Sequence, residues 1–321
     1  MAERAPNNLP DDEYRLCVRV AKLYHEGGLT QREIGGKLGL SRTKVHRILQ
    51  TAKEHGIVQI QIITPDTEYF DLEHDLITHY QLRDAIVVPS YPPGQDLYLS
   101  LVKGAVSWLE PKLEDDLRIG LGLGRTISHL PQAFNPNGQI DCTFTEVVGA
   151  ASDHNSDIAA YNITSKMAEI VGGKAEFFYA PTYVSSPSLK NNLIQEPAIK
   201  KSLARARNSD IVLQSVGPVD KSALLYLHGL LDEEDLQNLR SKGAVGDALG
   251  HYFGEMGHPV PFFTDQLMIG LELSDLTEIP WSVVIAGGKP KIPVLDAALK
   301  GKFFNVVVTD VDTAKELIKE S

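Results

Sequence analysis

The chain has 321 residues, of which 43% are hydrophobic and 23% are charged, as in globular proteins large enough for two domains. Its net charge is −11, and no apolar run approaches the roughly 20 residues that cross a bilayer. The first residues lack the basic-then-apolar pattern of a secretion signal. Two cysteines, Cys17 and Cys142, indicate neither a disulfide framework nor a cysteine-based metal cluster. We therefore expect a cytoplasmic protein with no membrane association and no metal site.

Positive charge is concentrated near the start of the chain. Between Arg15 and Lys53, nine Lys and Arg stand against Glu26 and Glu33, a local balance of +7 that leaves −18 on the remainder. Contacts to DNA phosphates require positive charge at the binding surface and do not require a positive net charge of the whole protein. The split predicts a small nucleic-acid-binding module attached to a larger acidic domain.

The first predicted elements are helical. Residues 1–12 are polar and contain proline, so we expect a disordered tail, followed by a helix over residues 13–26. Within residues 29–49, Thr30 and Glu33 have the spacing of a capping box. Gly39 then ends this second helix, and Ser41 caps a third.

The outer side of that third helix is basic. Val45, Ile48 and Leu49 share its inner side, which leaves the basic and polar residues to solvent. A helix-turn-helix presents such a helix to base edges in the major groove of double-stranded DNA. The alternative is an amphipathic hairpin with a solvated basic face, but the ordered series of cap, glycine and second cap favours DNA reading. The candidate DNA-binding residues are Thr30, Gln31, Arg32, Ser41, Arg42, Thr43, Lys44, His46 and Arg47.

Two further elements separate this helix pair from the acidic domain. Residues 57–63 alternate apolar and polar as a strand does, at the position of a β-wing, so we expect a winged helix-turn-helix over residues 13–64. A linker helix is predicted over residues 65–83, with four residues in helical register: Tyr69, Leu72, Leu76 and Tyr80. The spacing allows this helix to pair with its copy in another subunit or to pack on its own chain. Oligomerisation is favoured separately, because readers of this kind bind two half-sites.

Residues 84–321 alternate short apolar runs with amphipathic segments. The candidate strands are 85–89, 118–123, 144–149, 175–180, 210–217, 281–288 and 305–310. The candidate helices are 97–109, 158–171, 198–206, 233–242, 294–300 and 313–319. This alternation predicts an α/β domain with a doubly wound, mostly parallel sheet.

Glycine-containing stretches are expected at the carboxyl ends of these strands, where open α/β sheets bind ligands. In residues 120–126, GLGLGRT, backbone amides and Arg125 suit an anion, although Arg125 stands where the dinucleotide fingerprint requires glycine. Residues 148–156 are rich in small polar groups. In residues 243–250, Asp247 either accepts paired hydroxyls or caps a helix.

The last of these stretches, residues 286–291, brings two lysines to a glycine turn. Lys289 and Lys291 suit a phosphate as point charges, although solvated surface lysines are commoner. Together the four stretches predict one cleft with an anion-binding end and a hydroxyl-binding end. We expect its ligand to be a small-molecule effector, namely a phosphorylated sugar. We expect no cofactor.

With these motifs the chain resembles the SorC family of bacterial sugar-responsive transcriptional regulators, over about residues 11–319. The resemblance rests on LYHEGGLTQREIGGKLGLSRTKVHRIL, GLGLGRT, GAVGDALGHYF, and IAGGKPK followed by VVVTD. It implies a winged helix-turn-helix and an effector domain similar to phosphosugar isomerases and deaminases. It also implies a dimer or tetramer that binds operator DNA near genes for carbohydrate use. A sugar phosphate then alters DNA affinity, usually releasing repression.

The resemblance also places candidate ligand contacts. Arg125, Thr126 and Lys291 would surround the phosphate, and Asp247 would face sugar hydroxyls. Many members have paired glycines where this chain has Gly149 and Ala150, a departure that affects the contacts of the following loop. The candidate effector-binding residues are Gly122, Gly124, Arg125, Thr126, Gly149, Asp153, Asn155, Asn162, Asp247, Gly287, Gly288 and Lys291.

Two other functions compete with a regulator. An isomerase or deaminase with a helical appendage would need a positioned general base, yet neither Asp247 nor Asp153 has an evident catalytic partner. An architectural DNA binder would leave the glycine loops unexplained. We therefore assign no catalytic residues and predict a repressor.

Overall fold

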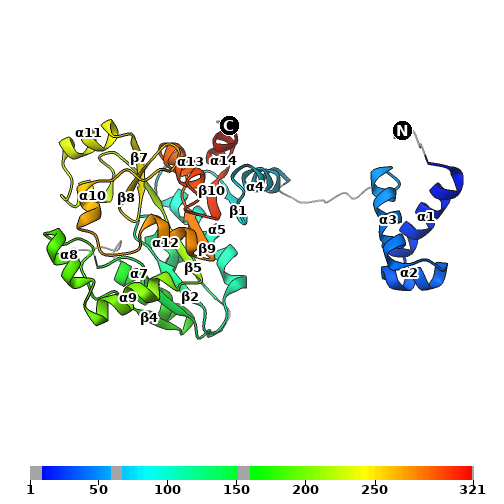
Figure 1. Ribbon diagram of the computed structural model, residues 1–321, viewed down its shortest axis with the longest axis horizontal. Helices are drawn as coiled ribbons and strands as arrows, with labels where there is room; N and C mark the ends of the chain where they lie inside the picture. Colours follow the sequence, from blue (N-terminus) through cyan, green and yellow to red (C-terminus); the bar gives the residue numbers. More distant parts are fainter. Residues whose placement is uncertain (1–8, 59–66, 137, 151–159, 320–321) are drawn as a thin grey trace. The chain divides into compact units, whose positions relative to one another are not determined.

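The computed structural model of the chain describes residues 9–58, 67–136, 138–150 and 160–319. They form two compact units, Met1–Pro65 and Asp66–Ser321 (Figure 1). None of the described helices combines the length and the apolarity that a membrane span requires.

The first unit is a three-helix domain of α1 (Asp11–His25), α2 (Gln31–Leu38) and α3 (Arg42–Glu54). Its helices pack around Val20, Ile34 and Val45, each 0% exposed. α1 begins inside the tail expected to reach residue 12, since the acidic residues of its first turn favour a helix N-terminus. The strand expected at residues 57–63 falls mainly outside the described residues.

The second unit is built on a seven-stranded sheet in the order β1-β10-β9-β5-β2-β3-β4, with every pair parallel. The strands are β1 (Asp84–Val88), β2 (Arg118–Leu121), β3 (Thr143–Glu146), β4 (Lys174–Glu176), β5 (Ile211–Gln214), β9 (Trp281–Ile285) and β10 (Val306–Asp310). These are the seven strands predicted from the sequence, which confirms the parallel α/β assignment.

Helices cover both faces of this sheet (Figure 1). Successive strand residues alternate between two cores: Val306 and Val308 pack in one, and Val307 in the other. The first core includes α5 (Gln95–Leu109), α6 (Leu130–Ala133) and α7 (Ala160–Val171). The second includes α4 (Thr67–Tyr80), α9 (Pro197–Arg207), α12 (Leu273–Glu278), α13 (Ile292–Lys300) and α14 (Val311–Lys319). Strands buried on both faces explain the continuous apolar runs of the sequence.

A second, antiparallel sheet was not predicted. It contains β6 (Val216–Pro218), β7 (Ala244–Ala248) and β8 (His251–Gly254). A tight turn joins β7 to β8 through Leu249 and Gly250, at φ 56° and 82°, as two-residue hairpins require. Residues 243–250 are therefore a hairpin and not the end of a parallel strand, and Asp247, within β7, caps no helix. Three short helices, α8 (Pro187–Leu193), α10 (Leu224–Leu227) and α11 (Glu233–Ser241), complete the described helical elements outside the 3-10 turns.

The linker helix α4 packs on its own chain. Leu76 is 0% and Tyr80 is 3% exposed in the core of the second unit, against which Tyr69 and Leu72 also pack. Of the two alternatives left open by the spacing, packing on its own chain is confirmed for this face. Phe70 lies off it and is 55% exposed.

Candidate DNA-reading surface and effector cavity

The turn between α2 and α3 is fixed by capping bonds. Thr30 Oγ1 accepts from Glu33 N at 3.3 Å, and Thr30 N donates to Glu33 Oε2 at 2.8 Å, which is the predicted capping box. Gly39 ends α2 at φ 65°, and Ser41 Oγ caps α3 by accepting from Lys44 N at 3.2 Å. These bonds set the direction in which α3 leaves the turn.

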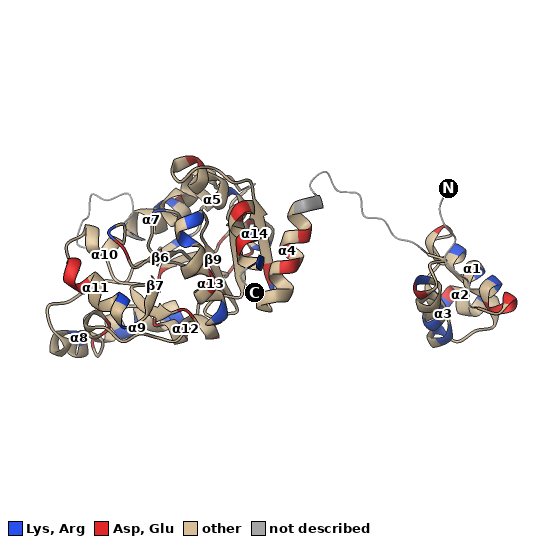
Figure 2. Cartoon of the chain, turned by 90° about the horizontal axis from the view of Figure 1, so that it is seen from above, with Lys and Arg blue, Asp and Glu red and all other residues tan. Residues whose placement is uncertain are grey.

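The first turns of α3 present polar and basic side chains to solvent. Val45 and Leu49 face the core, at 0% and 6% exposed, and the first turn contains no acidic residue. Lys and Arg recur along this helix (Figure 2). Of the candidate DNA-binding residues, Gln31 is half-buried and the others are exposed: Thr30, Arg32, Ser41, Arg42, Thr43, Lys44, His46 and Arg47. Such a surface can contact phosphates and base edges together.

In the second unit, a cavity of about 350 Å³ opens beyond the carboxyl ends of β2 and β5. From β2 the chain continues to β3 on one side, and from β5 it continues toward β9 on the other. The cavity therefore lies at the switch point of the topology, where open α/β sheets bind ligands. Gly122 N donates to Leu213 O at 3.0 Å and holds the two strand ends together.

Two cations line this cavity. Lys291 Nζ donates to Ser215 Oγ at 3.0 Å, and Arg125 donates to the carbonyl of Ser222 at 3.1 Å. Burial and, to a smaller extent, the nearby Arg125 lower the pKa of Lys291 to about 8, against the opposing effect of Asp247. An anion between Lys291 and Arg125 would relieve their mutual repulsion, so the pair can hold a phosphate or carboxylate.

Asp247 is the only carboxylate among the described lining residues. Gly250 N donates to its Oδ2 at 3.1 Å, and burial raises its pKa to about 6. A Cβ on Gly217 would lie 2.7 Å from Asp247 Oδ1, so glycine is needed where β6 pairs with β7. The carboxylate keeps further acceptor positions that can bind hydroxyls.

The glycines before Lys291 hold the loop and do not line the cavity. Gly288 N donates to Asp310 Oδ2 and to Thr313 Oγ1, both at 2.8 Å. A Cβ on Gly287 would lie 2.3 Å from the same Asp310 oxygen. These contacts tie the loop after β9 to the start of α14, and so fix where Lys291 enters the cavity.

The other candidates are divided among several places. Gly124 lines the cavity with Arg125, whereas Gly122, Thr126 and Gly149 do not line it; Gly149 lies between the lining residues Val148 and Ala150. Asn162 lies on α7 in a separate hollow that also includes Ser128 and His129. Asp153 and Asn155 lie outside the described residues.

Several lining residues were not among the candidates. Gln214 ends β5 and Ser215 follows it, so both could have been found from the strand-end rule; Gln214 Oε1 is buried without a partner in the described part of the chain. Thr182 and Tyr183 arrive through a bridge between Ala150 and Pro181, for which the local sequence carries no signal. Ser222, His228, Leu224 and Leu225 were also missed for this reason.

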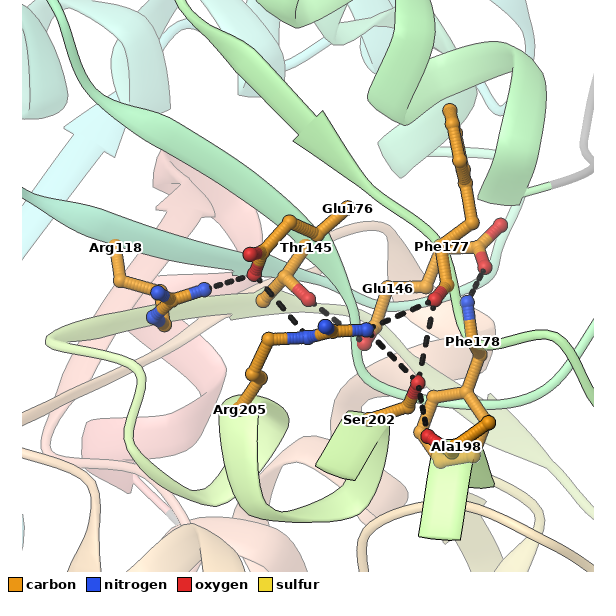
Figure 3. Close-up of polar contacts among 9 residues, drawn as sticks. All are labelled: Arg118, Thr145, Glu146, Glu176, Phe177, Phe178, Ala198, Ser202 and Arg205. Carbon is orange, nitrogen blue, oxygen red and sulfur yellow. Dashed lines mark hydrogen bonds and ion pairs between the residues drawn. The ribbon is translucent and has the colours of Figure 1, made fainter. Parts of the chain in front are cut away.

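A polar cluster beneath α9 supports the loops that follow β3 and β4 (Figure 3). Glu176 Oε2 lies 3.3 Å from Arg205 Nε and also accepts from Arg118. Glu146, at the end of β3, accepts from Phe178 N at 2.6 Å, and burial raises its pKa to about 7. Within the described residues, no group of three or more side chains could hold a metal ion.

Comparison with known proteins agrees with this architecture. Residues 65–319 match the Sugar-bind family model, a sugar-binding domain, and residues 23–59 match a winged helix-turn-helix DNA-binding model. The transcriptional regulator LsrR of Escherichia coli is 30% identical over 316 residues, covering 96% of this chain and 95% of that protein. The deoxyribonucleoside regulator of Bacillus subtilis is 27% identical over 310 residues, covering 96% and 99%.

Solved structures share the fold. The full-length sorbitol operon regulator SorC of Klebsiella pneumoniae superposes with a TM-score of 0.72 at 23% identity, covering 96% of this chain and 100% of that one. The relatives are named as transcriptional regulators, which favours a regulator over the isomerase or deaminase alternative.

Proposed function

The chain belongs to the SorC family of sugar-responsive transcriptional regulators, and we propose that it represses a carbohydrate catabolic operon until a phosphorylated sugar enters its cavity. The observation that carries the proposal is the pair of cations, Lys291 and Arg125, that converge in the cavity of a chain with an exposed basic reading helix. Relatives named for deoxyribonucleosides and a sorbitol operon support a carbohydrate effector.

On DNA, the first two turns of α3 would enter the major groove. Arg42 and Arg47 would contact base edges or phosphates, and Thr30, Gln31 and Arg32 at the start of α2 would contact the backbone. Because one helix reads only a few base pairs, we propose that the protein binds paired half-sites as a dimer or tetramer.

In the cavity, the phosphate would bind between Arg125 and Lys291, with Gly124 and Ser215 as further donors. Asp247 would accept from sugar hydroxyls. Asp153 and Asn155 remain predicted contacts that select the sugar; Asn162 was predicted as a third, but it lies in the separate hollow on α7. At neutral pH the shifted pKa values keep Asp247 mostly ionised and Lys291 mostly protonated, so both ends of the site are charged for this task.

One helix connects the cavity to the linker. α13 starts directly after Lys291, and its Val294 packs so closely on β7 that a Cβ on Gly246 would lie 1.8 Å from Val294 Cγ2. Further along α13, Asp296 Oδ1 accepts from the Tyr80 hydroxyl of α4 at 2.8 Å. We propose that effector binding shifts α13, and that this hydrogen bond passes the shift to α4. The DNA-reading unit comes directly before α4 in the chain.

A mobility-shift titration against the region upstream of its own operon tests this function. Specific binding should fall steeply with salt, and a sugar phosphate should weaken it about 5- to 150-fold, the usual range of allosteric coupling. Specific binding that no sugar or sugar phosphate alters would refute the gating, whereas no specific binding would refute the regulator itself.

A further inference from the structure

One segment supplies much of the apolar lining of the cavity, together with Ser222, His228 and Gly229. Residues 222–230, which include α10, contribute Ala223, Leu224, Leu225 and Leu230 to the lining. The charged groups Arg125, Asp247 and Lys291 come from three other segments. Of the five leucines among the described lining residues, three thus come from residues 222–230, and Leu123 and Leu249 come from the segments that carry Arg125 and Asp247.

Of the leucines that residues 222–230 contribute to the lining, only Leu225 packs with the protein core. Leu225 packs against the cluster around the buried Leu231, and Arg125 holds the carbonyl of Ser222, so the segment is anchored at several points. Leu224 and Leu230 are only half-buried and join none of the hydrophobic clusters found in the described residues. Their free surface faces the cavity they line, and apolar surface of this kind marks ligand contacts.

Apolar lining of this kind discriminates between ligand groups. Each methylene group buried against leucine raises affinity about fourfold. A hydroxyl group placed there would lose its water without gaining a partner, which lowers affinity. A sugar phosphate hydroxylated at every carbon would therefore be complementary to only the polar part of the cavity.

We infer that the effector is an amphipathic phosphate monoester: a deoxygenated or alkyl-substituted sugar phosphate whose hydroxyl-free carbons lie against Leu224 and Leu230. The inference rests on the proposed function, since it places the phosphate between Arg125 and Lys291. It adds that the carbon skeleton is recognised by apolar contact with Leu224 and Leu230.

Calorimetric titration of the full chain with matched phosphates tests it. n-Propyl phosphate and glycerol 3-phosphate share three carbons, and n-pentyl phosphate and ribitol 5-phosphate share five. We expect each alkyl phosphate to bind more tightly than its hydroxylated counterpart, and n-pentyl phosphate to bind roughly 15-fold more tightly than n-propyl phosphate. Tighter binding of the polyol phosphates would overturn the inference and leave the phosphate site standing. If no phosphate binds, inorganic phosphate included, both the inference and the proposed phosphate site are wrong.

Two leucines of α10 provide matched variants. Leu224 lines the cavity, whereas Leu227, three residues later, is 57% exposed and does not line it. Leu224→Ala should reduce the pentyl-to-propyl ratio to about fourfold or less, without changing the affinity for glycerol 3-phosphate. Leu227→Ala should keep the wild-type ratio. If both variants reduce the ratio, or neither does, the carbon chain does not lie against Leu224 and Leu230 and the inference is wrong.

Discussion

The two units carry their chemistry in opposite ways. The DNA-reading unit presents consecutive, exposed side chains of α3, held by caps a few residues away. The effector cavity brings together Arg125, Ser215, Asp247 and Lys291, which are far apart in the sequence, and buries them enough to shift the pKa values of Asp247 and Lys291. The residues that form an exposed helical surface are close together in the sequence, whereas the residues that form a cavity are brought together by the topology of the fold. Variants of the first unit should therefore change binding without changing the fold, and variants of the second should also respond to pH.

The largest effect is expected on the exposed helix. Arg42→Ala combined with Arg47→Ala should weaken operator binding by about a thousandfold or more, since two charged contacts are lost, and should lower the salt slope by about two. Fluorescence anisotropy over a range of salt concentrations measures both quantities. Lys53→Ala, at the last turn of α3, is the control and should cost far less. An equal loss per charge in all variants would mean that net charge, not the position on the helix, governs binding.

The next effect is expected in the cavity. Lys291→Met keeps the length of the side chain but removes its charge, and should weaken glucose 6-phosphate or inorganic phosphate binding about 100-fold. Wild-type affinity should also fall as the pH rises above about 8, where the free Lys291 loses its proton. Thermal shift and calorimetry measure these changes.

Lys289→Met is the matched control for this variant, because Lys289 belongs to the same 3-10 turn but is exposed and does not line the cavity. The glycine-turn pattern pointed to both lysines and the family resemblance selected Lys291; in the structure Lys291 lines the cavity and Lys289 does not. Equal losses in the two variants would contradict the placement of the phosphate.

The same difference explains what the sequence could predict. All seven parallel strands were predicted from short apolar runs that alternate with helical stretches, although β4 itself is only partly buried; the capping box of Thr30 and Glu33 was found from spacing alone. The antiparallel sheet was missed because β7, AVGDA, contains a glycine and lies within the glycine-containing stretch of residues 243–250, which resembles a loop. Gln214 and Ser215 stand near the carboxyl end of a predicted strand, so the strand-end rule could have identified them. Tyr183 and Leu224 could not be identified from the sequence, because only long-range packing brings them to the cavity.

A smaller effect concerns stability and pH. The pKa of Glu146 is raised from 4.5 to about 7 by burial, so ionisation of the unfolded chain makes folding less favourable as pH rises from about 4.5 to 7. Glu146→Gln keeps an acceptor for Phe178 N and removes this dependence. The stability of the variant relative to wild type should therefore rise by about 2 kcal/mol between pH 5 and pH 8. Denaturant titrations of both proteins at the two pH values measure this change in relative stability. Glu169→Gln, at an exposed site on α7, is the control and should show no rise in relative stability.

The smallest effect is expected at the connection between cavity and linker. Tyr80→Phe removes the hydroxyl, which lies 2.8 Å from Asp296 Oδ1 and 3.2 Å from Leu317 O of α14, but keeps the ring, which is 3% exposed in the core. If the hydrogen bond to Asp296 passes the movement of α13 to α4, the variant should bind ligand and operator with nearly wild-type affinity. The ligand, however, should change operator affinity about fivefold less, since one hydrogen bond contributes about 1 kcal/mol. Tyr69→Phe removes a hydroxyl from the same helix and is the control. A response lost equally in both variants would show that α4 is merely destabilised, and an unchanged response in Tyr80→Phe would move the coupling to another contact.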